Sequence, residues 1–279
     1  NLKKKITYQD IGFNIGPLIN SSGRIAKAND VVELFLAQDD DKIDKILNKM
    51  NTHNVTRKKI EQENLDLIDF KKYYSKNVIF IYNKKFHEGV IGILAAKLSK
   101  IFNKPCFIMT ESHDLLKCSI RSANNVKINK TINKLIANKL IISGGGHDEA
   151  GGFSAKKGYL SDIEEFLNNE YRTLKIRSFS YFDSFAIFPK KNSSIVSDLK
   201  SLEPFGKDNP EPIFYFKNIK SIKSKIINNR HVQNILKNKS GRLIKSISFD
   251  CVNSELGKYL LNFKKEFDLI ASIVENNWN

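Results

Sequence analysis

The sequence has little cysteine and no long apolar run. Its three cysteines, Cys106, Cys118 and Cys251, lie far apart and form no CxxC pair, which argues against a disulfide framework and against a cysteine-based zinc site. No segment approaches the roughly 20 apolar residues of a membrane-spanning helix, and the first ten residues lack the apolar core of a secretory signal. We therefore expect a protein of the reducing cytoplasm with no membrane partner.

Motifs of several enzyme classes are also missing. His87 and Glu88 begin an HExxH zinc motif, but Ile91 stands where the second histidine would be. There is no GxSxG, no GK[ST] of a P-loop, and no cluster of Asp and His suited to two divalent metals. We therefore expect no catalytic centre and no metal site within this chain.

Negative charge is scarce relative to positive charge. The 279 residues include 46 Lys and Arg against 30 Asp and Glu, a net charge of +16. Nine basic and no acidic residues lie between Lys217 and Lys245, and six basic and no acidic ones between Leu115 and His147. Phosphate neutralisation supplies most non-specific nucleic-acid affinity, so the clusters favour a polyanion partner. The alternative is a lysine-rich surface produced by the drift of an AT-rich genome.

The N-terminal quarter contains two predicted regions. Residues 1–38 begin as a loop, which includes GPLINSSGR (16–24), and end in a short helix over 31–36. No Gly or Pro occurs from Asp39 to Tyr74, and the apolar residues there follow helical spacing. This pattern predicts one long connecting helix over 39–75, and a break, if the helix has one, is expected near Thr52.

The rest of the chain predicts an α/β domain and a small all-β domain. Residues 76–175 show strands over 77–83, 105–111 and 115–122, a fourth ending near Ala155, helices over 90–102 and 126–139, and a Ser161–Glu164 capping box that begins a helix to Leu174. Residues 176–200 predict a linker. Residues 201–279 predict short strands over 213–216, 219–227, 231–236, 243–249 and 267–274 with a helix near 254–261, a pattern typical of an OB-like barrel.

The glycine-rich run GGGHDEAGG (144–152) is the strongest local signal. Its five glycines remove the Cβ atoms that keep a backbone from a ligand. We expect Gly144, Gly145 and Gly146 to form a loop whose consecutive N–H groups make an anion nest, with His147 beside it. The alternative is a flexible turn with a surface histidine.

Three further positions suggest phosphate contacts. In KCSIRSAN, Ser119 and Arg121 share one face of a strand, followed by Ser122, and hydroxyl with guanidinium is a phosphate-binding pair. An edge strand with polar ends explains the pattern equally well. Arginine is scarce, with seven in all, so Arg24 in SSGR stands out because its planar fork binds phosphate in two places. His87 could cap the helix that follows or orient a ligand, or it could simply be solvated.

The ordered segments GPLINSSGR, a long helix, FHEGVIG, SIRS, GGGHDEAGG and LEPFGKDNPEPIF resemble the C-terminal portion of the RecJ family of the DHH phosphoesterase superfamily. The resemblance runs from about Ile11 to the C-terminus. It implies an α/β DHH-associated domain, joined by a long helix to the tail of a DHH domain and followed by an OB-like barrel. Two departures from the family pattern are the Ser residues before Gly23 and SANN after Arg121, where the family often has a Pro-Gly turn.

The resemblance implies a metal-dependent 5′-to-3′ single-stranded-DNA exonuclease of DNA repair and recombination. Its Mn²⁺ or Mg²⁺ would sit in a DHH domain whose signatures this chain lacks, so we expect a fragment that is inactive alone and binds no metal. The resemblance implies substrate contacts at Arg24, His87, Ser119, Arg121, Ser122 and the Gly144–His147 loop. Candidate base-stacking residues in the barrel are Tyr215, Phe216 and Phe249, which core packing explains as well.

The partner implied is single-stranded DNA, with a single-strand-binding protein or a helicase as candidate protein partners and a monomeric state. Two alternatives stay open. One is a DHH-family phosphodiesterase for short oligonucleotides or cyclic dinucleotides, which would have no use for a basic barrel. The other is a non-catalytic nucleic-acid-binding module.

Overall fold

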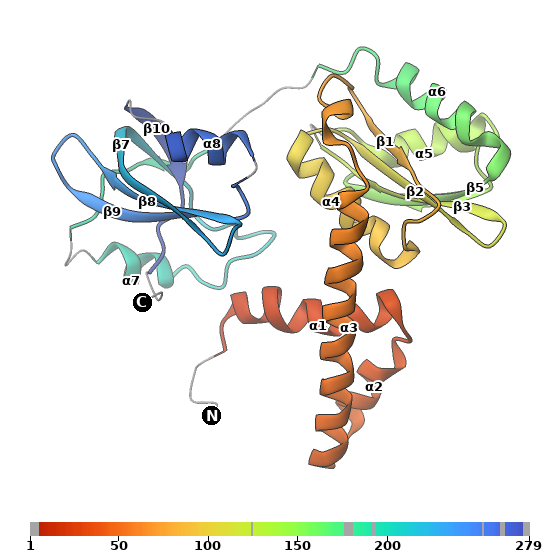
Figure 1. Ribbon diagram of the computed structural model, residues 1–279, viewed down its shortest axis with the longest axis horizontal. Helices are drawn as coiled ribbons and strands as arrows, with labels where there is room; N and C mark the ends of the chain where they lie inside the picture. Colours follow the sequence, from red (N-terminus) through yellow and green to blue (C-terminus); the bar gives the residue numbers. More distant parts are fainter. Residues whose placement is uncertain are drawn as a thin grey trace. The chain divides into compact units, whose positions relative to one another are not determined.

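The computed structural model describes residues 6–123, 125–175, 181–190, 194–252, 254–262 and 266–275. The chain forms two compact units, Asn1–Ser178 and Phe179–Asn279 (Figure 1). In the described ranges, every helix is too short or too polar to cross a membrane.

The first unit begins with helices where a loop was predicted. A π-helix, η1 (Asp10–Ile15), continues into α1 (Gly16–Ile25), and α2 (Asn29–Leu36) follows. Pro17 lies in the first turn of α1, where its fixed φ suits a helix. Ser21 and Ser22 are fully buried, because their small side chains let α1 pack closely against α3. The predicted loop over 16–24 was therefore wrong, since tertiary packing overrides weak local preferences.

The long helix α3 (Asp40–Asp66) connects these N-terminal helices to a sheet (Figure 1). The side chain of Asp39 caps it by accepting from the N–H of Lys42 at 3.0 Å. The helix continues unbroken past Thr52 and ends at Asp66, before the short 3₁₀-helix η2 (Phe70–Tyr73). Ile46 and Met50 are buried in its first half, whereas Leu65 at its end joins the core beneath the sheet.

The sheet of the first unit has the strand order β1-β2-β3-β5-β4. Its strands are β1 (Ile79–Tyr82), β2 (Cys106–Ser112), β3 (Leu115–Arg121), β4 (Ser143–Gly146) and β5 (Ala150–Lys156). β1 and β2 are parallel and the other pairs antiparallel. The three strands predicted first are confirmed, and so is a strand ending near Ala155. β4 was missed, because the sequence predicted a loop there.

Helices cover the two faces of this sheet unequally. On one face α5 (Ile128–Ala137) and α6 (Leu160–Glu170) enclose a core that includes Phe107, Leu116 and Phe153. On the other, α4 (Glu88–Phe102) packs against β2 and β3, over Ile79 and Ile108. The prediction that Ser161 and Glu164 form a capping box was wrong. The helix α6 begins at Leu160, and its N-cap is Tyr159, which makes no side-chain hydrogen bond there.

The second unit is a curled sheet with the order β10-β7-β8-β9, consistent with an OB-like barrel. Its strands are β7 (Phe214–Ile227), β8 (His231–Lys237), β9 (Leu243–Ser248) and β10 (Phe267–Ala271), accompanied by the helices α7 (Ile195–Lys200) and α8 (Glu255–Asn262). The two strands predicted over 213–227 form the single strand β7, whose register shifts between Ser221 and Lys223. Such an irregularity bends a strand and increases its twist.

Part of the predicted linker over 176–200 belongs to the folded second unit. β6 (Ser184–Phe185) pairs in parallel with β7, and Phe188 is buried beside Phe216 and Ile219. Burial of a large aromatic side chain is what ties this segment to the barrel. Residues 176–180 and 191–193 of that range lie outside the described residues.

We expect Gly144→Ala to destabilise the first unit. An added Cβ would lie 2.9 Å from Phe153 Cβ and 3.0 Å from Ile132 Cγ2, and such overpacking costs about 1–3 kcal/mol. Thermal unfolding should show a midpoint lowered by about 2–4 °C per kcal/mol. Gly145→Ala is the matched control, because nothing lies within 4 Å of its Cβ position. Equal melting temperatures for the two variants would contradict this account.

Candidate functional site

The half of the sheet formed by β3, β5 and β4 has an open face, on the same side as α4. Side chains alternate along β3, so Lys117, Ser119 and Arg121 point to this side, while Leu116, Cys118 and Ile120 enter the core. Ser119 lies opposite Gly152, which lies opposite Gly145. Neither glycine carries a side chain, so bare backbone lies beside Ser119. The predicted shared face of Ser119 and Arg121 is confirmed, and β3 is an inner strand rather than an edge strand.

Two arginines reach the edge of this open face, and both lie against the first turns of α4. Arg121 is half-buried and donates to the carbonyl of Ile120 at 2.8 Å and to Ser119 Oγ at 3.4 Å. Its pKa is lowered, first by burial and then by the charge of Arg24. Arg24, at the end of α1, donates to the carbonyl of Gly89 at 3.3 Å. No ion pair found among the described residues includes either arginine. The site therefore concentrates positive charge that no carboxylate of the described chain neutralises.

Two glycines of α4 permit this arrangement. A Cβ on Gly89 would lie 1.8 Å from the carbonyl oxygen of Arg24, which is a backbone atom that cannot yield. A Cβ on Gly92 would lie 3.2 Å from Ser119 Oγ and 3.6 Å from Arg121 Nη2. Gly89 and Gly92 thus let α1 and β3 approach the same turns of α4. Sequence reasoning gave neither residue a role, although both lie within FHEGVIG.

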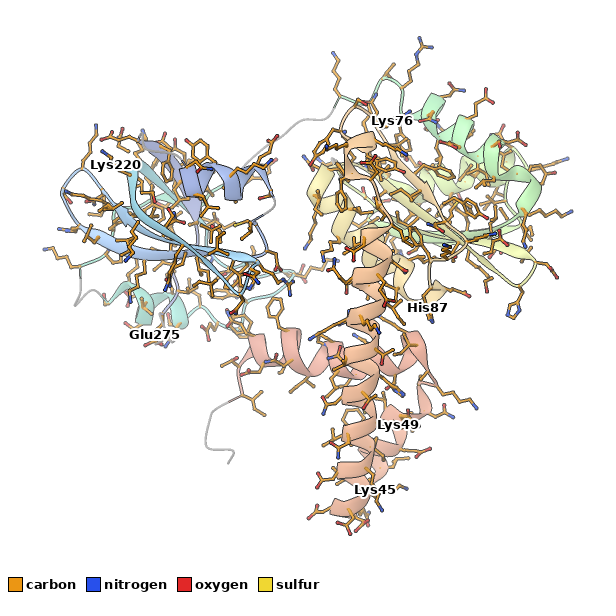
Figure 2. The ribbon with its side chains drawn as sticks, in the orientation of Figure 1. Lys45, Lys49, Lys76, His87, Lys220 and Glu275 are labelled. Carbon is orange, nitrogen blue, oxygen red and sulfur yellow. The ribbon has the colours of Figure 1, made fainter. Side chains whose placement is uncertain are left out.

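His87 caps α4, the helix against which both arginines lie, and the sequence predicted such a cap as one of its alternatives. It is the N-cap of α4, and its Nδ1 accepts from the N–H of Gly89 at 3.1 Å (Figure 2). An Nδ1 that accepts cannot carry the proton of the neutral ring, so that proton is on Nε2. His87 is exposed, so its Nε2–H can serve as a donor at the start of α4.

The glycine-rich run does not form the predicted anion nest. Gly144 to Gly146 are strand β4, paired with β5, and successive N–H groups of a strand point in opposite directions. Gly144 is needed for packing, because its Cβ position is filled by Phe153, Ile132 and Ile141. Gly146 is needed because a Cβ would lie 2.3 Å from the carbonyl oxygen of Ala150. Only Gly145 of the three faces open space.

His147 and Ser122 close the end of the sheet near Arg121. The N–H of His147 donates to the carbonyl of Ala150 at 2.8 Å, and Ala150 lies opposite Arg121 in register. The imidazole of His147 is exposed. Ser122 has a structural use instead, since its hydroxyl donates to the carbonyl of Val126. The structure thus brings Arg24, Ser119 and Arg121 together, with His87 and Gly145 close by in the fold. It does not add the Ser122 hydroxyl to them, because that hydroxyl donates to the Val126 carbonyl.

Further polar groups on the open face were missed from the sequence. Lys117 Nζ donates to Ser154 Oγ at 3.0 Å, and Ser154 lies opposite Ser143. A shallow depression of about 410 Å³ is lined by these three residues and Gly152, among others. Lys117, Ser119 and Arg121 are spaced two residues apart. This spacing was the sequence signal that could have placed Lys117 on the same face as the other two.

The three aromatic residues suggested in the barrel differ in exposure. Phe216 is buried in the core of the second unit, so it cannot stack on a base. Phe249 is exposed and contacts the ring of His231. Tyr215 is partly exposed and belongs to a cluster with Phe182 and Phe185.

Within the described ranges, no three His, Cys, Asp or Glu side chains come close enough together to hold a metal ion. The side chains of the described residues therefore do not fit a divalent metal centre. The three thiols are free and buried, and burial raises the pKa of Cys106 and Cys118.

Comparison with protein families matches two domains in succession. The DHHA1 domain model matches residues 75–174, and the RecJ OB domain model matches residues 186–279. Two curated relatives are both called single-stranded-DNA-specific exonuclease RecJ. The protein of Haemophilus influenzae is 25% identical over 91% of this chain and 47% of its own length, and that of Bacillus subtilis is 22% identical over 97% of this chain and 35% of its own.

Solved structures show the same fold. The crystal structure of RecJ from Thermus thermophilus in complex with Mn²⁺ matches with a TM-score of 0.82 and 20% identity, over all of this chain and 40% of that one. The corresponding complex with Mg²⁺ gives a TM-score of 0.79 at 20% identity. The chain spans about half or less of the length of the relatives it matches. From its two successive domains, its relatives and its fold, we conclude that the chain belongs to the RecJ family.

Proposed function

We propose that this chain binds single-stranded DNA and positions its phosphates within a metal-dependent 5′-to-3′ exonuclease of DNA repair and recombination. The observation that carries the proposal is that Arg24 and Arg121 both reach the first turns of α4, beside a bare glycine face. Relatives named as single-stranded-DNA-specific exonucleases support the substrate class.

The electrostatics of the arginine pair explain why a phosphate would bind there. Bringing two like charges together is unfavourable, and partial burial of Arg121 raises that cost because it removes water. A bound phosphate offsets both effects, since a guanidinium can donate two parallel hydrogen bonds to it. Ser119 and the Nε2–H of His87 would add neutral donors. Gly145 and Gly152 leave room for the sugar–phosphate chain to approach the strands.

In this proposal the hydrolytic step belongs to the whole enzyme. Related structures contain Mn²⁺ or Mg²⁺, and we propose that either metal serves the enzyme from residues other than those described in this chain. The contribution of this chain is to hold the substrate in place, which lowers the entropic cost of reaction. We further propose a cytoplasmic, monomeric protein for which a single-strand-binding protein or a helicase is a candidate partner.

We expect this chain to bind single-stranded DNA in preference to duplex DNA, and not to cleave it. Fluorescence anisotropy with a 5′-labelled oligonucleotide, across a salt series with Mn²⁺ present, measures both properties when the DNA is examined afterwards. Affinity should fall steeply with salt, because each neutralised phosphate releases counterions. A site size of two or three nucleotides would instead support a small-substrate phosphodiesterase. Equal binding to duplex and single strand, or no binding, would contradict the proposal.

We expect Arg121→Ala to weaken single-strand binding and to reduce the slope of log K against log[salt] by about 0.7–1. Arg121→Lys should preserve most of the slope but lower the affinity, because lysine cannot bind bidentately. Arg172→Ala is the matched control, since Arg172 is an exposed arginine that follows α6 on the other side of the sheet. Equal slopes for the Arg121→Ala and Arg172→Ala variants would remove Arg121 from the site.

We expect Gly145→Val to weaken single-strand binding at least about tenfold without lowering the melting temperature. The new side chain would enter open space, so the fold tolerates it, and a valine favours a strand. It would, however, cover the bare backbone that the DNA approaches. The readouts are anisotropy and thermal unfolding, with Gly158→Val as a control at another open glycine position. Wild-type affinity in the Gly145→Val variant would show that DNA does not cross this face.

A further inference from the structure

The second unit carries a cluster of three aromatic rings at its surface. The rings of Phe182, Phe185 and Tyr215 lie 5.0–5.4 Å apart, centroid to centroid. Phe185 is 61% exposed, although it belongs to β6 and its backbone is paired with β7. Its ring is therefore held in position at the surface. The hydroxyl of Tyr215 donates to Asp268 Oδ2 at 2.5 Å, which fixes the orientation of the second ring.

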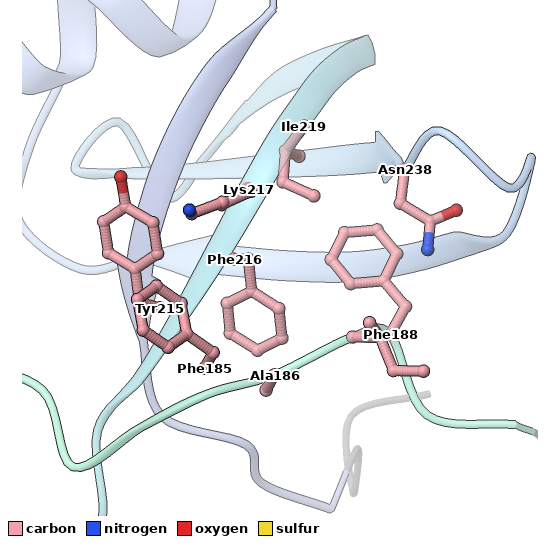
Figure 3. A pocket seen from close by; sticks show the side chains of 9 residues that line it. Phe185, Ala186, Phe188, Tyr215, Phe216, Lys217, Ile219 and Asn238 are labelled. Atoms are coloured by element: carbon pink, nitrogen blue, oxygen red, sulfur yellow. The ribbon is translucent and has the colours of Figure 1, made fainter.

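A pocket of about 320 Å³ opens next to this cluster (Figure 3). Phe188, Phe216 and Ile219 form its floor and are buried core residues. Phe185 and Tyr215 form its aromatic wall. A volume at the lower end of the range for ligand sites suits one small planar group rather than an extended molecule.

Polar groups at the rim of the pocket point to a ligand with both a ring and a charge. Asn238 Oδ1 accepts from the N–H of Arg242 and from Ser240 Oγ, each at 2.9 Å, so its Nδ2 is the atom that can donate into the pocket. Figure 3 shows the Asn238 side chain beside Phe188. Lys217 Nζ lies 5.0 Å from the centre of the Phe185 ring, a cation–π contact.

The charged residue that lines the pocket is a cation, Lys217, which suits an anionic partner. Lys217 begins the stretch to Lys245 that holds nine basic and no acidic residues. The nearby carboxylate of Asp268 is engaged by the Tyr215 hydroxyl and by the N–H of Asn218, and these hydrogen bonds lower its pKa. It therefore stays a charged acceptor that holds Tyr215.

We propose that this pocket binds a single unstacked nucleobase of single-stranded DNA. The base would stack on Phe185 or Tyr215 and accept a hydrogen bond from Asn238 Nδ2, while Lys217 would contact the adjoining phosphate. Base–aromatic stacking tolerates any sequence, because every base has a π-face. A duplex cannot supply such a face, since its bases are stacked on one another. The inference rests on the proposed function and adds a structural reason for single-strand selectivity.

The test compares normal and abasic DNA. In the full chain, Phe185→Ala should weaken binding to a single-stranded oligonucleotide about tenfold, with little change in the salt slope, because no charge is lost. An oligonucleotide with abasic sites throughout should bind the wild type and the Phe185→Ala variant equally. Phe185→Leu keeps an apolar side chain at the surface but has no ring, and it should behave like Phe185→Ala.

Leu256→Ala is the matched control, because Leu256 is an apolar residue that is 52% exposed in the same unit but does not line the pocket. An equal loss of affinity in the Leu256→Ala variant would overturn the proposal, as would a Phe185→Ala loss that is the same on abasic DNA. The latter result would point to an altered fold. If the wild type binds single strands in a salt-dependent way but Phe185→Ala has no effect, only this inference fails. If the wild type binds no single-stranded DNA, the proposed function fails as well.

Discussion

The contact between the end of α1 and the first turns of α4 is the constraint on which the candidate site depends. The Arg24 carbonyl lies so close to Gly89 that no side chain fits between them. This contact brings Arg24 to the turns of α4 that Arg121 reaches from β3 past Gly92. The charge of Arg24 is near enough to lower the pKa of Arg121. Each arginine alone would be an ordinary surface charge. Two together, with Arg121 partly desolvated and neither paired with a carboxylate of the described chain, would form the anion site that we propose.

The sheet contributes through the unequal distribution of helices on its faces. α5 packs so closely beneath β4 and β5 that Gly144 and Gly151 have no space for a Cβ atom. On the opposite face, Gly145 meets nothing within 4 Å, and Gly152 likewise adds no side chain. The same glycine-rich run therefore serves two purposes. Alternate glycines allow dense packing on one side and leave the backbone bare on the other, as the two-residue period of a strand requires.

In the proposed function, the two units would hold a single strand by different physical means. In the first unit the groups are cationic or hydrogen-bonding and would contact the phosphate backbone, so their contribution decreases with salt. In the second, the exposed rings and the pocket beside them would contact bases, and stacking depends little on salt. Backbone contacts alone cannot distinguish a single strand from a duplex, whereas ring contacts can. Selectivity would then arise in the barrel and much of the salt-dependent affinity in the sheet.

The sequence by itself determined the alternation of strands and helices in the first unit, the basic barrel of the second, and the pairing of Ser119 with Arg121. These follow from short-range periodicity and composition, which depend on near neighbours along the chain. The sequence also named Arg24 as a candidate phosphate contact, although it predicted a loop at that position. Only the tertiary structure decided that GPLINSSGR is helical, because the buried Ser21 and Ser22 need α3 to pack against. It also decided that Gly144–Gly146 form a strand rather than an anion nest, and that Phe185 and Phe188 belong to the barrel, since each depends on a partner distant in sequence.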